Sequence, residues 1–138
     1  MSVPLRSVLP RVLVALAATV LIAWFAVLAR DEAIGGAAAE RIHHRPDMDA
    51  ADWARSIDQL RDAELLDPGT EWSVRRASYL VLRDKAAAAR VAESVVRREP
   101  DNLDAWVALL RATRGRDPRR AQQALAQVSR LNPPLAGR

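Results

Sequence analysis

The chain has one long run of apolar positions near its amino end. Residues 12–29 read VLVALAATVLIAWFAVLA, in which Thr19 is the one polar side chain. As a helix this run would be about 27 Å long, close to the thickness of the hydrocarbon core of a bilayer. Because the run is apolar on every face, it predicts a transmembrane helix rather than a half-buried helix of a soluble domain.

A cleaved signal peptide is the alternative interpretation of the same run, with cleavage between Ala29 and Arg30. The run exceeds the roughly 7–15 apolar residues of a typical signal peptide, which favours an uncleaved signal-anchor. Arg6 and Arg11 precede the run and favour a cytoplasmic amino terminus. Both interpretations place the rest of the chain outside the cytoplasm. The signal-anchor interpretation predicts a single-pass protein of the inner (plasma) membrane.

Residues 30–48 are predicted to form a linker. Gly35 and Gly36 lower the helix propensity, although the alanines that follow could resume a helix. Arg45 and Pro46 bias the backbone toward an extended conformation and a break. The linker would separate the span from the helices beyond it.

From residue 49 onward, apolar positions recur at helical spacing and predict five helices. The expected ranges are 49–66, 71–82, 85–98, 103–114 and 118–131. Residues that favour helix starts precede these ranges. The predicted caps are Asp47, Thr70, Asp84, Asp101 or Asn102, and Asp117, with Pro118 in the first turn of the last helix.

The helices recur with a period. Pro68, Pro100 and Pro133 follow one another at intervals of 32 and 33 residues, and Trp72 and Trp106 are 34 residues apart. Helix pairs that repeat near this period are typical of helical solenoids. The pattern resembles the tetratricopeptide repeat family over residues 49–134, with residues 49–68 as the second helix of an earlier unit.

The resemblance implies a repeat core in which small residues allow paired helices to approach and large ones fill the space between layers. The expected core residues are Trp72, Tyr79, Ala88, Ala92 and Val95 in one repeat, and Trp106, Leu109, Ala121, Leu125 and Val128 in the next. Arg75 and Arg76 depart from the family pattern, which prefers leucine and a small residue there.

The predicted fold is therefore all-α: one transmembrane helix followed by a short tetratricopeptide-like α-solenoid of about two and a half helix pairs. The predicted segments are a basic tail (1–11), the span (12–29), the linker (30–48), the helical domain (49–134) and a carboxy-terminal tail (135–138).

Charge and composition narrow the functional classes. The formal net charge is +4, and all 17 acidic residues follow position 30 among interspersed basic ones. Such a surface is not typical of a nucleic-acid-binding protein. Lys85 is the only lysine among 21 basic residues, which we interpret as the coding bias of a GC-rich bacterial genome.

The sequence contains no recognisable catalytic constellation. It has no cysteine, no Ser–His pair with a plausible third member and no HExxH motif. His43 and His44 have no nearby ligand set and are interpreted as surface residues of the linker. We therefore expect no enzymatic activity, no cofactor and no metal.

In the family, the first helices of successive pairs line a concave groove that accepts peptides or helices. The residues that the resemblance places there are Ser73, Ala77, Leu80, Val107, Arg111 and Arg114. The lysine and asparagine set with which some relatives bind a terminal carboxylate is missing. The expected partner is another protein with an acidic contact at the two arginines.

The sequence thus favours a membrane-anchored protein-protein interaction module, as a scaffold or assembly factor of a bacterial envelope complex. Two alternatives remain: an accessory subunit of an envelope polysaccharide-assembling enzyme, and a secreted or periplasmic adaptor after signal cleavage.

Overall fold

The computed structural model describes residues 5–65 and 69–133, and within these ranges all regular structure is helical. The helices are α1 (Leu5–His44), α2 (Ala50–Glu64), α3 (Glu71–Leu80), α4 (Lys85–Arg98), α5 (Leu103–Thr113) and α6 (Pro118–Leu131). The last five match the predicted ranges to within two residues at each end. The all-α prediction is confirmed for this part of the chain.

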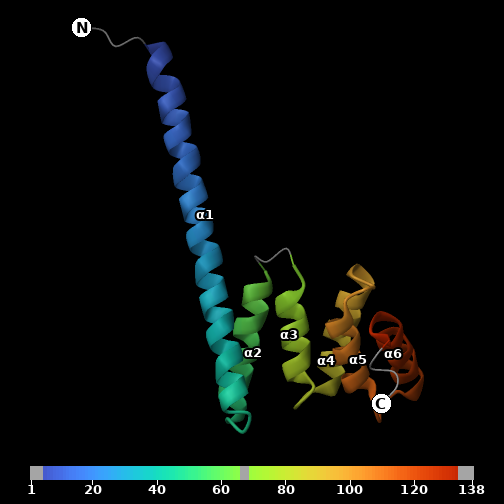
Figure 1. Ribbon diagram of the computed structural model, residues 1–138. Coiled ribbons are helices and arrows are strands. Elements are labelled where there is room, and N and C mark those ends of the chain that lie inside the picture. The colour runs from blue at the N-terminus through green and yellow to red at the C-terminus, as the bar shows by residue number, and fades with distance from the viewer. Residues whose placement is uncertain (1–4, 66–68, 134–138) are drawn as a thin grey trace.

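Helix α1 is continuous for 40 residues, and it corrects the predicted linker. Its apolar part stands clear of the other helices, whereas its carboxy-terminal part lies against α2 (Figure 1). Residues 30–44, expected as linker, are thus helical. Ala38, Ala39 and Ile42 on this part are 0%, 6% and 1% exposed. This tertiary packing outweighs the low helix propensity of the glycine pair.

The break after α1 leads into a helix whose cap differs from the prediction. The side chain of Asp49, not that of Asp47, accepts a hydrogen bond of 2.8 Å from the backbone N–H of Asp52. The preceding Met48 is buried, and its backbone N–H donates to the carbonyl of Arg45 at 3.1 Å in the turn between α1 and α2. The other caps formed by side chains are Asp84, Asn102 and Asp117.

The helices pack in chain order, each against the next, and α3 also contacts both α1 and α5. They stand side by side with the lower part of α1, and the stack extends laterally away from it (Figure 1). Polar contacts join α1 to this stack as well. Arg41 Nη1 donates to Gln59 Oε1 at 3.1 Å, and Tyr79 Oη donates to the carbonyl of Ala39 at 3.2 Å.

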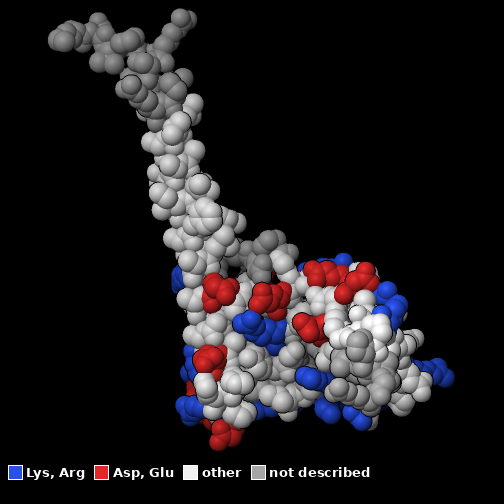
Figure 2. Space-filling model, viewed as in Figure 1, with Lys and Arg blue, Asp and Glu red and all other residues white. Residues whose placement is uncertain are grey.

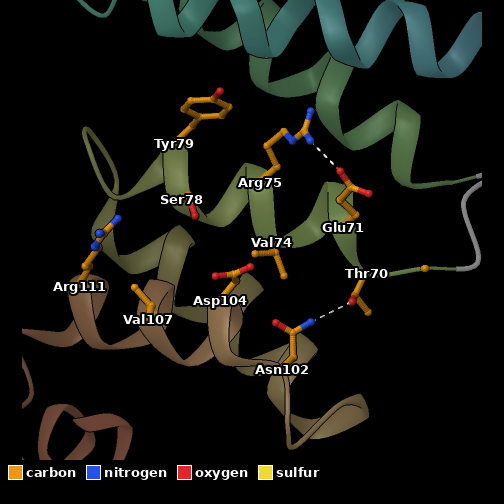
Figure 3. A pocket seen from close by; sticks show the side chains of 11 residues that line it. Thr70, Glu71, Val74, Arg75, Ser78, Tyr79, Asn102, Asp104, Val107 and Arg111 are labelled. Atoms are coloured by element: carbon orange, nitrogen blue, oxygen red, sulfur yellow. Dashed lines mark hydrogen bonds and ion pairs between the residues drawn. The ribbon is translucent and has the colours of Figure 1, made fainter. Parts of the chain in front are cut away.

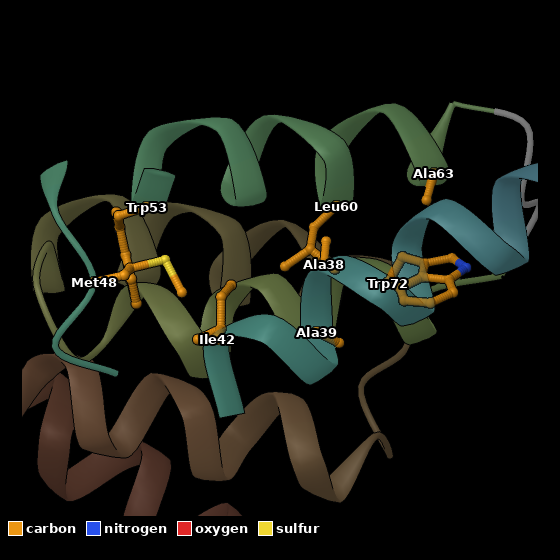
Figure 4. Close-up of a cluster of buried hydrophobic side chains, with 8 residues drawn as sticks. All are labelled: Ala38, Ala39, Ile42, Met48, Trp53, Leu60, Ala63 and Trp72. Atoms are coloured by element: carbon orange, nitrogen blue, oxygen red, sulfur yellow. The ribbon is translucent and has the colours of Figure 1, made fainter. Parts of the chain in front are cut away.

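The buried core begins in α1. One cluster unites side chains of α1, α2, α3 and the turn before α2 (Figure 4). Its members are Ala38, Ala39, Ile42, Met48, Trp53, Leu60, Ala63 and Trp72. A second cluster unites side chains of α3, α4, α5 and α6. It includes the small residues Ala77, Ala105 and Ala124. The helix that carries the apolar run is therefore also the first helix of the packed domain.

Most predicted core residues are buried: Trp72, Ala88, Ala92, Val95, Leu109 and Val128. Tyr79, Trp106 and Ala121 are partly buried. Leu125 is 52% exposed, and this prediction is wrong. The neighbouring Ala124 is fully buried in its place, because one residue of rotation moves a side chain about 100° around a helix and a small residue lets α6 approach α5 closely.

Candidate functional site

A groove of about 790 Å³ lies between α3 and α5 (Figure 3). From α3 and the residues before it come Gly69, Thr70, Glu71, Val74, Arg75, Ser78 and Tyr79. From α5 and its cap come Asn102, Asp104, Val107 and Arg111. The groove thus mixes apolar, hydroxyl and charged side chains.

The structure brings two of the six predicted groove residues, Val107 and Arg111, into this lining. Arg114 is exposed at the carboxy-terminal cap of α5 and lies outside it.

The other three predicted groove residues, Ser73, Ala77 and Leu80, lie inside the domain at 7%, 0% and 7% exposure. Their placement in the groove is corrected by about one residue of helix rotation, since Val74 and Ser78 line it instead. The sequence does contain a sign of the correct rotation of α3. Ser73 and Ala77 are both small and four residues apart, which marks the side of the helix that approaches other helices.

The α5 side of the groove carries unpaired charge. Asp104, Val107 and Arg111 follow one another at helical spacing, so they form one line along the groove. Within the described residues, neither Asp104 nor Arg111 forms an ion pair. Both side chains are exposed and available to a partner.

The α3 side is neutralised internally. Arg75 Nη2 lies 2.6 Å from Glu71 Oε1, and the guanidinium sits 4.7 Å from the centre of the Trp72 ring. Arg76 turns away toward α2, where its two hydrogen bonds to the Glu64 carboxylate measure 2.6 and 2.8 Å. The two arginines that depart from the family pattern therefore each have a structural partner.

A hydrogen-bonded cluster joins the amino-terminal ends of α3 and α5 at one end of the groove. Thr70 Oγ1 donates to Glu99 Oε2 at 2.6 Å, and Asn102 Nδ2 donates to the same oxygen at 2.8 Å. Thr70 precedes α3 as predicted, but its side chain makes no cap bond there. Asn102 meanwhile caps α5 through the N–H of Ala105.

These hydrogen bonds, first from Thr70 and then from Asn102, lower the pKa of Glu99 below its ordinary value of 4.5. Burial opposes the shift, and the charge of Arg98 adds to it. A carboxylate whose pKa is lower in the folded state than in the unfolded state stabilises the fold when the pH is above the unfolded pKa. This stabilisation is lost as the pH falls through the folded pKa.

We therefore expect Glu99→Gln to lower the melting temperature at pH 7 and to have a progressively smaller effect as the pH is lowered below about 4.5. Circular dichroism melts of both proteins in mild detergent across this range would measure the difference. A difference that stays constant down to pH 3 would contradict the assignment of the charged form to the cluster.

A second, smaller hollow in the described part of the chain is lined mainly by charged side chains. This cavity of about 310 Å³ between α4, α5 and the start of α6 is lined by Lys85, Arg90, Arg116 and Arg120, among others. Arg120 there pairs with both Glu93 and Asp117, as expected for a solvated, mixed-charge face.

The histidines lie at the end of α1, not in a linker. His43 and His44 are exposed, and His44 Nε2 lies 2.6 Å from Glu40 Oε1. In the part of the chain that the structure describes, no three histidine, aspartate or glutamate side chains group closely enough to hold a metal ion.

Among the described residues one helix, α1, is long and apolar enough to cross a membrane. The candidate site is the open groove between α3 and α5. Its α3 side carries charges that are paired within the helix, and its α5 side carries the unpaired Asp104 and Arg111. Comparison of the chain with protein-family models, with curated proteins and with solved structures finds no match.

Proposed function

We propose that the protein is a membrane-anchored interaction module of the tetratricopeptide type, which acts as a scaffold or assembly factor of a bacterial envelope complex. The observation that carries the proposal is the groove between α3 and α5, joined through packed helices to a helix that can cross a membrane. The proposed activity is the binding of a peptide or helix, not catalysis.

The packing order supports a repeat architecture. Helices α1 and α2, α3 and α4, and α5 and α6 form successive pairs, and α3 contacts the first helices of both neighbouring pairs. Small residues lie between the helices of these pairs: Ala88 of α4 is 0% exposed and clusters with Leu80 of α3 and Ala112 of α5. Because α1 contributes the first helix of the earlier unit, the proposed solenoid has three complete pairs rather than two and a half.

The composition of the groove favours a peptide over a small molecule. Val74, Val107 and Tyr79 provide apolar contacts, while Asp104 and Arg111 offer charges to a partner. Peptide- and helix-binding grooves commonly combine apolar anchor contacts with flanking charges that set orientation and association rate. We therefore propose a partner segment with an acidic residue opposite Arg111 and a basic residue opposite Asp104.

We expect Arg111→Glu to reduce capture of the partner about tenfold or more, because two like charges would then face each other in the groove. The measurement is quantitative mass spectrometry of proteins that co-purify with the full chain in mild detergent. Arg114→Glu is the matched control, since Arg114 is an exposed arginine at the same end of α5 but outside the groove. Equal recovery by both variants would refute the groove assignment.

We also expect the full chain to remain in the membrane fraction after extraction with alkaline carbonate, because residues 12–29 bury enough apolar surface for stable insertion. Immunoblotting of pellet and supernatant would measure this. A soluble product that begins at Arg30 would instead establish cleavage, leaving Arg30 to His44 to pack against α2 in a free adaptor.

A further inference from the structure

We propose that the groove receives the juxtamembrane segment of a second membrane-spanning protein. The segment would present a basic residue nearest the bilayer and an acidic residue about 10 Å further from it. This inference rests on the proposed function, since it requires α1 to cross a membrane and the groove to bind a peptide. It adds the location of the partner segment and the order of its charges.

The height of the domain above the bilayer supports the inference. Gly35 follows Arg30, the first charged residue after the apolar run, by five residues, or about 7.5 Å along a helix. This distance is about the thickness of one headgroup layer. A Cβ atom on Gly35 would lie 2.8 Å from Trp72 and 3.0 Å from Ala63, so α2 and α3 reach this level. The domain therefore begins at the membrane surface.

The direction of α3 relative to the membrane follows from its contacts with α1. Trp72, near the start of α3, lies at Gly35, whereas Tyr79, near its end, donates to the carbonyl of Ala39. Helix α3 therefore runs away from the bilayer, parallel to α1. Asn102 Nδ2, at the start of α5, lies 3.3 Å from Thr70 Oγ1, at the start of α3. The groove thus has its Thr70 end toward the membrane.

This arrangement gives the groove an electrical polarity. Glu71 and Asp104 occupy the first turns of α3 and α5, and Arg111 occupies the last turn of α5. Such charges complement each helix dipole. Because the two helices start at the same end, both first-turn acids lie near the membrane. On the face drawn in Figure 2, most of the visible acidic side chains lie in the upper part of the stack, whereas the lower edge carries several basic side chains together with an acidic one.

The unpaired charges define the occupant. Asp104 and Arg111 are seven residues apart, or about 10.5 Å along α5, with Val107 between them. A segment that leaves the bilayer with a basic residue, then an apolar one, then an acidic one matches this line. A freely diffusing peptide could enter in either direction, whereas a segment tethered in the same membrane must enter from the membrane end.

The test uses the full chain in phosphatidylcholine vesicles with synthetic probes. The first probe has a leucine–alanine span and a helical extension with an arginine near the span and a glutamate seven residues later. The second probe exchanges these two residues, and the third is the extension without a span. The chain has no cysteine, so Ser78→Cys in the groove reports contact by disulfide formation with a cysteine midway along each extension, with dioxygen and a copper–phenanthroline catalyst as the oxidant. Gln122→Cys on the exposed side of α6 is the control.

We expect the first probe to cross-link to Ser78→Cys with about tenfold higher yield than the second, and neither to cross-link to Gln122→Cys. A seven-residue helical insert containing glutamate and lysine, placed after Arg30, would raise the groove by about 10 Å with little rotation. This insert should abolish cross-linking of the anchored probe and leave that of the free extension unchanged. The same insert before the span should change neither.

Each contrary result has a distinct meaning. Equal yields for both charge orders, or cross-linking of the anchored probe that survives the raised groove, would overturn the inference. Binding of the free extension would then leave the proposed function standing. A further outcome is that no probe cross-links while the Arg111→Glu variant still recovers fewer co-purifying proteins than the parent. In that case the inference fails and the proposed function stands. Cross-links between two Ser78→Cys chains would identify a second copy as the occupant and overturn it.

Discussion

Trp72→Ala is expected to lower the free energy of unfolding by about 3–5 kcal/mol, the range for a buried aromatic replaced by alanine. Trp72 is 4% exposed and belongs to the cluster that joins α1, α2 and α3. Its removal would leave a cavity beside Gly35 and loosen the contact between the span helix and the domain. Chemical unfolding of the full chain in mild detergent, followed by circular dichroism, would measure the loss.

Trp106→Ala provides the matched comparison, because the two tryptophans stand at equivalent places in the sequence period. Trp106 is only partly buried, and its Nε1 donates to the carbonyl of Pro100 at 2.7 Å on an exposed face. We therefore expect a smaller loss of about 1–2 kcal/mol. Equal losses at the two positions, or an unchanged unfolding curve for Trp72→Ala, would contradict the described packing.

Gly35→Ala is expected to destabilise the chain by about 1–3 kcal/mol, as overpacking in a filled core does. The added Cβ would lie 2.8 and 2.9 Å from two carbons of the Trp72 ring. That ring is 4% exposed and packed in the first core cluster, so it would have to shift against its buried neighbours. The measurement is the same unfolding experiment, with the fluorescence of the tryptophans as a second readout.

Gly36→Ala is the internal control for this prediction. Among the described residues, no atom would lie within 4 Å of the added Cβ. In a helix, alanine is favoured over glycine by about 0.8–1 kcal/mol, so this variant should be slightly more stable than the parent. Destabilisation by both substitutions would show that α1 does not pack here as the structure describes.

The helices beyond the span could be predicted because their boundaries are encoded locally. Asp84 and Asp117 each accept a hydrogen bond from a backbone N–H three residues later, and Pro118 supplies no N–H in the first turn of α6. These contacts depend on short stretches of sequence. The order of residues therefore predicts the ends of these helices to within two residues.

The continuity of α1 could not be predicted in the same way. The glycine pair suggests a break when only neighbours along the chain are considered, whereas the structure uses Gly35 to admit the Trp72 ring. A signal does exist in the sequence: Gly35, Ala38, Ala39 and Ile42 recur at helical spacing and form one face of small and apolar residues. When the helices that pack on this face are not known, the glycine- and alanine-rich segment has the composition of a flexible linker.

The sequence predicts only part of the groove lining, for a related reason. Val107 and Arg111 line it, while Ser73 and Ala77 face the interior. Which side of a helix faces a groove depends on its rotation, and an error of one residue turns the helix by about 100°. Repeat spacing predicts the order of helices well but constrains this rotation weakly. Leu125 on α6 illustrates the same sensitivity.

In the proposed membrane-anchored state, the unbroken α1 helix couples the orientation of the packed domain to that of the span. Without a hinge between residues 12 and 44, a tilt of the span turns the helical stack through the same angle. Helix α1 extends about 20 Å beyond Arg30, so a tilt of about 20°, the average for transmembrane helices, would move its end sideways by about 7 Å. A change in the tilt of α1 would thereby change the direction in which the groove faces.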